Sequence, residues 1–233
     1  MKQILVVDDD PHLRDVVVYT LQREGHAVTA AHDGRAALDA LLKPAARAFD
    51  LVVLDILMPE VDGLEVCRRL RASPRAHVPV VFLSSRDEEI DKVLGLEMGG
   101  DDYVTKPFSP RELAARVKAV LRRAEAASAP PIDAGTALRV GPVSVDLARH
   151  EVRCRDGLLR LTVTEFGLLA SLMERPGVVL TRAQLMERAY AYDNLITERT
   201  IDTHVRRIRA KFREVGGDPI ATVHGVGYKA AEG

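Results

Sequence analysis

The segment LVVLD (residues 51–55) is a run of four apolar residues that ends on a carboxylate, Asp55. An unbroken apolar run of this length is typical of a strand that is covered on both faces in a parallel sheet. Since parallel strands end at the same edge of their sheet, polar groups at several strand ends would line one crevice. Three further segments have the same form, namely ILVVDDD (4–10), VPVVFLS (78–84) and DDYVTKP (101–107).

Apolar runs of strand length alternate with segments of helical periodicity throughout the first half of the chain. This alternation predicts a doubly wound α/β domain of the flavodoxin type with a five-stranded parallel sheet. The strands are predicted at 3–7, 27–31, 50–54, 79–83 and 102–105, and the helices near 11–24, 34–43, 62–72, 87–98 and 109–123.

The stretch EAASAPPIDAGT (125–136) has small residues and a Pro pair without apolar periodicity. It predicts a linker between a first domain (1–124) and a second domain (137–233). The second domain has short strands, then helices, then a Gly-containing hairpin, an order that predicts an α+β winged helix-turn-helix. Its strands are predicted at 138–140, 143–147, 150–154 and 158–161, its helices near 164–175, 182–189 and 198–213, and its hairpin at TVHGVGYKA (222–230).

Length and composition bound the class of protein. A chain of 233 residues suits two domains, each large enough for its own core. The net charge of −1 gives no global attraction to nucleic acid or membrane, although the second half is more basic than the first. One cysteine in each half predicts no disulfide and a reducing compartment. The apolar run before Asp8 is too short for a signal peptide and no run could span a membrane, so a cytoplasmic location without a membrane partner is expected.

The crevice at the strand ends predicts a site for one Mg²⁺ ion and a phosphoryl group. Mg²⁺ prefers oxygen ligands and is usually held by one or two carboxylates together with phosphate. Asp8, Asp9 and Asp55 supply such ligands, and Asp55, at the end of the central strand, is the best placed nucleophile toward a phosphoryl donor. Lys106 would pair with the phosphoryl oxygens, and Ser84 would donate a hydrogen bond to one of them.

Each strand-end signal alone is open to a purely structural interpretation. An aspartate after a strand is often a turn residue or a helix N-cap, and Asp10 before Pro11 fits an N-cap with proline at the first helical position. The coincidence of suitable residue types at four strand ends favours a functional site.

The motifs VVDDD, LDILMP, FLSS and DDYVTKPF resemble the receiver domain of bacterial response regulators, over residues 1 to about 123. The resemblance implies that Asp8 and Asp9 are the acidic metal-binding pair and that Asp55 is the phosphoacceptor. It also implies that the main-chain carbonyl of Leu57 reaches Mg²⁺ and that Lys106 pairs with the phosphate. The family often has a cis bond before the following proline, here Pro107.

The resemblance further implies a phosphorylation switch, with Ser84 as the switch hydroxyl and Tyr103 as the switch aromatic. Phosphorylation would draw Ser84 toward the site, and Tyr103 would rotate inward. Ser84-Ser85 and Gly99-Gly100 depart from the common Thr-Ala and Gly-Ala pairs.

The pattern is similar to the OmpR/PhoB subfamily, which implies a two-fold dimer through the fourth helix, fifth strand and fifth helix. Self-complementary charges, such as Lys92 with Glu112 and Asp102 with Arg116, would pair across the two-fold axis. Exposed helix charges are also often merely solvated. The predicted dimer face consists of Lys92, Glu97, Asp101, Asp102, Glu112, Arg116 and Arg122.

The segment RTIDTHVRRIRAKF (199–212) has one apolar stripe and an Arg-rich remaining arc. Ile201, Val205, Ile208 and Phe212 are spaced four, three and four apart, so they form the stripe that packs on the core. The other side could present guanidinium groups to DNA phosphates and to guanine edges in a major groove. A charged face is usually only solvated, but the preceding helix and the terminal hairpin favour DNA.

Residues from about 137 to 230 resemble the winged-helix effector domain of the same subfamily, notably in LTVTEFGLL (161–169), in the basic helix and in the terminal hairpin. The loop 191–197 corresponds to one that can touch RNA polymerase in related proteins. His224 stands where family wings commonly have Arg, and histidine is charged only in part near neutral pH, which weakens a minor-groove contact. By position, the resemblance implies Asp202, Thr203, Arg206 and Arg207 as base-facing residues and Arg199, His204 and Arg209 as phosphate contacts.

The leading hypothesis is a phosphorylation-controlled, DNA-binding transcription regulator that works with a sensor histidine kinase and dimerises on repeated half-sites. An alternative is an Mg²⁺-dependent phosphatase of the haloacid dehalogenase type. Such phosphatases have a second Asp two residues after the nucleophile, where this chain has Leu57, so turnover of exogenous substrates is not expected. A third hypothesis is a phosphorylation-independent regulator whose first domain serves only for dimerisation.

Overall fold

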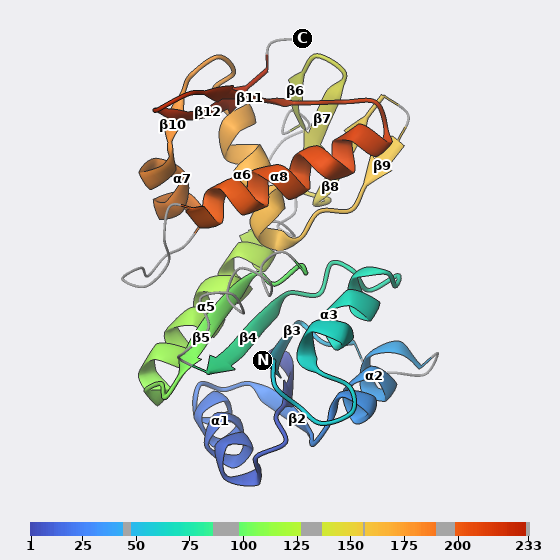
Figure 1. Cartoon of the computed structure of the whole chain (residues 1–233), viewed down its shortest axis with the longest axis vertical. Coiled ribbons are helices and arrows are strands. Elements are labelled where there is room, and N and C mark those ends of the chain that lie inside the picture. The colour runs from blue at the N-terminus through green and yellow to red at the C-terminus, as the bar shows by residue number, and fades with distance from the viewer. Residues whose placement is uncertain (44–47, 86–97, 127–136, 156, 190–198, 232–233) are drawn as a thin grey trace. The chain divides into compact units, whose positions relative to one another are not determined.

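The computed structural model describes residues 1–43, 48–85, 98–126, 137–155, 157–189 and 199–231. The chain divides into two compact units, Met1–Leu121 and Arg122–Gly233 (Figure 1). Among the described residues, no helix is long and apolar enough to cross a membrane.

The first unit is built on a five-stranded parallel sheet in the order β2-β1-β3-β4-β5. Every residue of β3 is buried, as expected for a central strand covered on both faces. The chain leaves β1 toward one edge of the sheet and leaves β3 toward the other, so the carboxyl ends of β1 and β3 form the switch point where such folds bind ligands. The strands are β1 (Gln3–Val7), β2 (Ala27–Ala31), β3 (Leu51–Asp55), β4 (Val80–Ser85) and β5 (Asp102–Lys106).

Helices cover both faces of this sheet. Val17 of α1 and Leu113 and Val117 of α5 belong to one core cluster with strand residues such as Val53, so α1 and α5 cover one face. On the other face α2 packs against α3 (Figure 1). The Asp10 carboxylate accepts hydrogen bonds from the first turn of α1, which confirms the expected N-cap. The helices are α1 (Pro11–Arg23), α2 (Gly34–Leu42), α3 (Gly63–Arg71) and α5 (Pro110–Ala126).

The second unit combines two antiparallel sheets with three helices that pack on one another. A four-stranded sheet has the order β6-β7-β8-β9, and a three-stranded sheet has the order β10-β12-β11. The helices are α6 (Val163–Met173), α7 (Arg182–Ala189) and α8 (Arg199–Glu214). The strands are β6 (Ala137–Val140), β7 (Val143–Asp146), β8 (Glu151–Cys154), β9 (Gly157–Leu159), β10 (Leu180–Thr181), β11 (Ile220–Val223) and β12 (Gly227–Ala230).

The predicted elements agree with this architecture, apart from a few boundaries. β10 was not predicted, because a strand of two residues leaves no periodic pattern. α5 continues to Ala126, two residues into the segment predicted as a linker. The helix predicted at 87–98 and the rest of the linker lie outside the described residues, apart from Met98.

Candidate functional site

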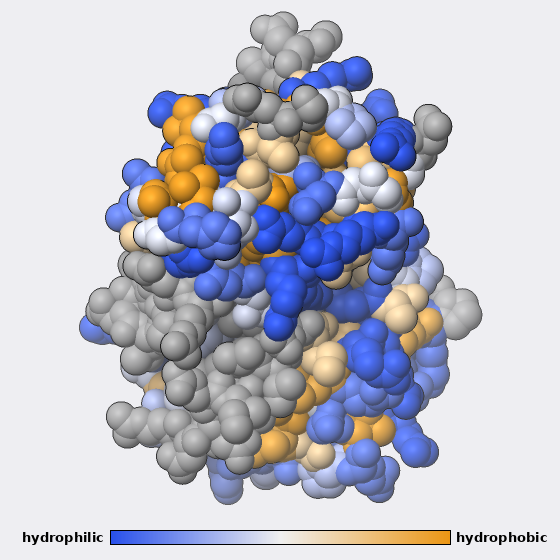
Figure 2. Space-filling model, turned by 45° about the horizontal axis from the view of Figure 1, so that its top comes forward, coloured by the Kyte–Doolittle hydropathy of each residue, from blue (hydrophilic) through white to orange (hydrophobic). Residues whose placement is uncertain are grey.

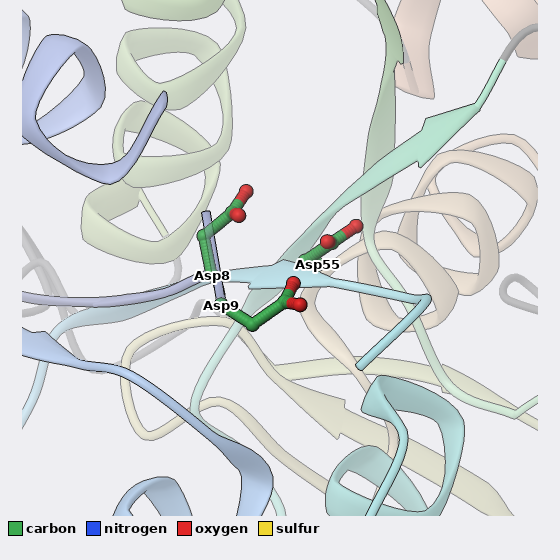
Figure 3. Close-up of side chains that lie close together, drawn as sticks. All are labelled: Asp8, Asp9 and Asp55. Atoms are coloured by element: carbon green, nitrogen blue, oxygen red, sulfur yellow. The ribbon is translucent and has the colours of Figure 1, made fainter. Parts of the chain in front are cut away.

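Three carboxylates meet at the carboxyl edge of the parallel sheet. Asp8 and Asp9 follow β1, Asp55 ends β3, and one oxygen of each lies within 4.8 Å of the others. Asp8 and Asp55 are buried, with 0% and 4% of their surface exposed, whereas Asp9 is exposed. Figure 3 shows the three carboxyl groups around one space at the ends of these strands. The structure therefore brings together the side chains that the sequence predicts as metal ligands.

Local contacts hold this edge in place. The Asp10 amide donates to Asp8 Oδ1 at 3.0 Å, and Arg14 Nη1 donates to the main-chain oxygen of Asp8 at 2.7 Å. Beyond β3, α3 begins so close to the strand that a Cβ atom on Gly63 would lie 2.0 Å from the main-chain oxygen of Asp55. Glycine at position 63 is therefore required for the loop that follows Asp55.

Lys106, at the end of β5, places its ammonium between two of the carboxylates. Its Nζ lies 3.0 Å from Asp8 Oδ2 and 2.9 Å from Asp55 Oδ2. Burial raises the pKa of Asp55 above its ordinary value, and the hydrogen bond from Lys106 partly opposes this. Burial lowers the pKa of Lys106, but its contacts with Asp55 and Asp8 outweigh burial, so the net direction is upward. One ammonium faces three carboxylates, and the remaining negative charge suits a divalent cation.

The other predicted residues of the first unit lie around this edge. Ser84 is fully buried, and its Oγ has no hydrogen-bond partner within the described segments. Tyr103, predicted to rotate inward on phosphorylation, is already buried with 4% exposed. Leu57 exposes 56% of its surface, and its amide donates to the Asp55 carboxylate. The bond between Lys106 and Pro107 is cis.

The structure corrects part of the predicted dimer face. Arg116 Nη1 lies 3.2 Å from Asp102 Oδ1 in the same chain, and both residues are buried. Asp101 has no exposed surface and pairs with Arg71 at 3.0 Å. These charges were expected to face a second subunit, but packing of α5 on β5 pairs Asp102 with Arg116 internally.

Of the remaining dimer-face residues, Glu112 is half-buried and lies 3.3 Å from Arg116 Nε, and Arg122 is exposed. Lys92 and Glu97 lie outside the described residues.

The described side chains of α8 divide into a buried stripe, two flanks and an outward stripe. Ile201, Val205, Ile208 and Phe212 are buried, as predicted. The outward stripe is formed by half-buried Thr203 together with exposed Arg206, Ala210 and Arg213. Arg199 belongs to this stripe by helical position, although its side chain lies outside the description. Hydrophilic side chains gather over α8 in Figure 2.

On one flank of α8, two predicted DNA contacts face the domain instead. His204 is fully buried, because its helical position borders the apolar stripe, so it cannot reach a phosphate directly. Arg207 Nε lies 3.2 Å from Oε1 of the buried Glu165 on α6, so the prediction that its guanidinium faces bases is wrong for this structure. Lys211 Nζ completes the cluster, 2.6 Å from Glu165 Oε2.

On the other flank, two further predicted DNA contacts join α8 to the terminal hairpin. Asp202 Oδ1 accepts hydrogen bonds from Tyr228 Oη at 2.6 Å and from Arg182 Nε at 2.8 Å. Arg209 Nη2 donates to Ile220 O at 2.7 Å and to Thr222 Oγ1 at 2.9 Å. Asp202 and Arg209 thus connect α8 to α7, β11 and β12, and their assignment as DNA contacts stays a prediction.

The hairpin of β11 and β12 forms the wing. His224, at its turn, is exposed, so the predicted minor-groove residue is accessible. At the base of the wing, a Cβ on Gly227 would lie 2.1 Å from the main-chain oxygen of Leu180, so only glycine lets β12 pair this closely with β10.

On α8, the predicted DNA-binding set omitted the exposed Arg213, although its helical spacing from Arg206 was visible in the sequence.

A doubly wound domain with a strand-end carboxylate site, followed by a winged helix, defines a class: a receiver joined to a DNA-binding output domain. Residues 4–118 match the response regulator receiver domain, and residues 156–230 match the C-terminal domain of transcriptional regulatory proteins. The chain belongs to the OmpR/PhoB family of two-component response regulators.

Full-length relatives support this membership. The chain is 43% identical to the sensory transduction protein RegX3 of Mycobacterium tuberculosis over 231 residues, covering 98% of this chain and 99% of the relative. It is 41% identical to the alkaline phosphatase synthesis transcriptional regulatory protein PhoP of Bacillus subtilis, and the match covers 99% of this chain and 97% of the relative. Among solved structures, a RitR mutant matches with a TM-score of 0.79 at 25% identity over 100% of both chains. The response regulator DrrB of Thermotoga maritima, an OmpR/PhoB homologue, matches with a TM-score of 0.51 at 32% identity, covering 99% of both.

Proposed function

We propose that this two-component regulator is controlled by phosphorylation of Asp55 by a cognate sensor histidine kinase. The observation that carries the proposal is the carboxylate cluster of Asp8, Asp9 and Asp55 with Lys106 between two of its members. An Asp55 oxygen forms a bond to the phosphorus of a phosphohistidine as the phosphorus–nitrogen bond breaks, which gives an aspartyl phosphate. Lys106 then exchanges its contact with the carboxylate for one with a phosphoryl oxygen.

The donor set fits one Mg²⁺ ion. Asp8, Asp9 and Asp55, together with the main-chain carbonyl of Leu57, would hold it, and hard oxygen ligands are those that Mg²⁺ prefers. When bound, the ion would neutralise charge between the carboxylates and the incoming phosphoryl group. Leu57 occupies the position where a phosphatase of the haloacid dehalogenase type has its general acid. The protein therefore assists only its own phosphorylation and dephosphorylation.

Phosphorylation would promote a two-fold dimer on repeated DNA half-sites. Glu112, Arg122, Lys92 and Glu97 remain as the proposed charged contacts of the dimer face, with Ser84 and Tyr103 linking it to the phosphoryl site. In the output domain, the accessible stripe supports Thr203 and Arg206 as DNA contacts, and Arg213 joins them. Arg199 is proposed as a further contact by its position in the sequence. His224 would contact the minor groove from the wing.

In this proposal, residues 1–124 form the receiver, residues 125–136 form a linker and residues 137–233 form the effector domain. Because the proposed partners are a kinase and chromosomal DNA, we propose that the protein acts in the cytoplasm. By its resemblance to related proteins, the loop 191–197, which lies outside the described residues, is proposed as a contact for RNA polymerase.

Labelling by a small phosphodonor tests the proposal. The wild-type protein should be labelled in the presence of Mg²⁺, and labelling should disappear with EDTA and in Asp55→Asn. Asp39→Asn is the matched control, because Asp39 is an exposed carboxylate of α2 that pairs with Lys43. Undiminished labelling of Asp55→Asn would refute the assignment.

A further inference from the structure

Two buried hydroxyl oxygens stand in neighbouring strands at the carboxyl edge of the receiver sheet. Ser84 of β4 is in register with Thr105 of β5, so both side chains lie on one face of the sheet. Ser84 Oγ and Thr105 Oγ1 are both buried, and neither has a hydrogen-bond partner in the part of the chain that the structure describes. A buried hydroxyl without a partner costs free energy, and two neighbouring ones require an explanation.

The position of Thr105 relates it to the predicted switch. Thr105 precedes Lys106, whose ammonium contacts Asp55. It also follows Tyr103 by two residues, which places both on the same face of β5. Thr105 therefore lies next to Ser84 across the strands and near Tyr103 along its own strand.

We propose that Thr105 is a second switch hydroxyl, which acts through Ser84 and becomes hydrogen-bonded when Asp55 carries a phosphoryl group. This inference rests on the proposed phosphorylation of Asp55. A hydroxyl has one donor hydrogen and two acceptor lone pairs. Ser84 Oγ donates its hydrogen to a phosphoryl oxygen, and its lone pair accepts the hydrogen of Thr105 Oγ1. The chain from Thr105 through Ser84 to the phosphoryl group satisfies both hydroxyls at once.

Because of this hydroxyl chain, the phosphoryl group interacts more favourably with the state in which the two hydroxyls are hydrogen-bonded than with the state in which they are not. Among the described residues the buried pair has no hydrogen-bond partner, and the proposed chain to the phosphoryl group would give both hydroxyls one, so phosphorylation favours the state in which the chain forms. Successive hydrogen bonds in a chain also polarise and strengthen one another. Thr105 is a positioning residue in this scheme, because it touches Ser84 and not the phosphoryl group.

The test uses the full-length protein with Mg²⁺ and beryllofluoride as the phosphoryl mimic. The thermal transition is measured without the mimic, and the midpoint of a beryllofluoride titration is followed through the Lys106 amide resonance. Thr105→Val should not lower the transition temperature, because it removes an unsatisfied hydroxyl and keeps the shape. The same variant should bind the mimic about fivefold more weakly, the size of one net hydrogen bond, and Thr105→Ser should restore binding. Thr29→Val, a hydroxyl deletion on β2 of the same sheet, is the matched control and should bind the mimic as the wild type does.

A double-mutant cycle completes the test. In Ser84→Ala, the added Thr105→Val change should cause no further loss of mimic binding, because Thr105 acts through Ser84. Wild-type affinity in Thr105→Val, or additive losses in the double variant, would overturn the role of Thr105. A wild-type protein that does not bind the mimic, or an Asp55→Asn variant that binds it equally, would instead refute the proposed phosphorylation and this inference with it.

Discussion

Arg207 Nε lies 3.2 Å from Oε1 of Glu165, a side chain with no exposed surface. Glu165 Oε2 also accepts a hydrogen bond from the Thr162 amide in the capping box that begins α6, and Lys211 Nζ lies 2.6 Å from this same oxygen. One buried carboxylate thus connects the start of α6 to the middle of the basic helix. Such a charge is stable only while its partners remain, so it fixes the position of α8 on the domain.

Glu165 should make stability depend on acid pH. Burial alone would raise its pKa, but the charges of Arg207 and Lys211 lower the pKa to about 2, well below the ordinary value of a glutamate. Because the folded-state pKa is depressed, the stabilisation is fully present above about pH 4.5 and is lost as pH falls toward 2. Acid unfolding should show a loss of roughly 3 kcal/mol across this window. Glu165→Gln should flatten this part of the curve, and an unchanged pH dependence would contradict the assignment.

Arg206 should contribute more to DNA affinity than to the stability of the fold. Its side chain is exposed on the outward stripe of α8, so Arg206→Ala should weaken binding to a specific site by about 1 to 3 kcal/mol and leave the thermal transition within a degree or two. Arg207→Ala is the matched comparison, because removal of the partner of Glu165 should destabilise the fold. Binding isotherms and thermal melts of both variants show whether Arg206 serves DNA binding and Arg207 serves stability. Equal loss of stability in the two variants would show that the division is wrong.

Arg213 should contact phosphate and not bases, because it lies near the carboxyl end of the outward stripe. Arg213→Gln should therefore weaken specific and random DNA alike and reduce the slope of log affinity against log salt by about one. Fluorescence anisotropy at several salt concentrations measures both quantities. A loss confined to the specific site would indicate base recognition by Arg213 instead.

Tyr228 should stabilise the wing through its hydroxyl. Tyr228 Oη donates to Asp202 Oδ1 at 2.6 Å, so Tyr228→Phe should lower the free energy of unfolding by about 1 kcal/mol. Asp202→Asn should reduce the effect of a second change at Tyr228, since both belong to one hydrogen-bond cluster. Denaturant unfolding of the two single variants and the double variant measures this coupling.

Arg116 should act mainly within its own chain. Arg116→Ala removes the buried ion pair between Arg116 and Asp102 and should cost about 3 kcal/mol of stability in the unphosphorylated monomer. Glu112→Lys should instead impair phosphorylation-dependent dimerisation, and Lys92→Glu in the same chain should restore it. Thermal melts and sedimentation of the phosphorylated variants separate these roles.

The sequence predicted the sheet and the acidic crevice well because both depend on strand ends. Asp8 and Asp55 each follow an apolar run, and the parallel topology alone brings them together. The basic helix was harder to interpret, because the apolar stripe identifies the buried side but not what each flank contacts. Glu165, 42 residues before Arg207, and Tyr228, 26 residues after Asp202, determine which polar residues of α8 turn inward. Such pairings depend on tertiary packing and leave no periodic signal.

The contact between Gly227 and the main-chain oxygen of Leu180 has a genetic consequence. Gly227→Ala would push β12 away from β10 and displace the wing, while the first unit keeps its own core and its carboxylate site. Under the proposed function, such an allele would still draw phosphoryl groups from the kinase and would form mixed dimers with wild-type subunits. It should therefore be dominant over the wild-type copy, unlike a simple null allele.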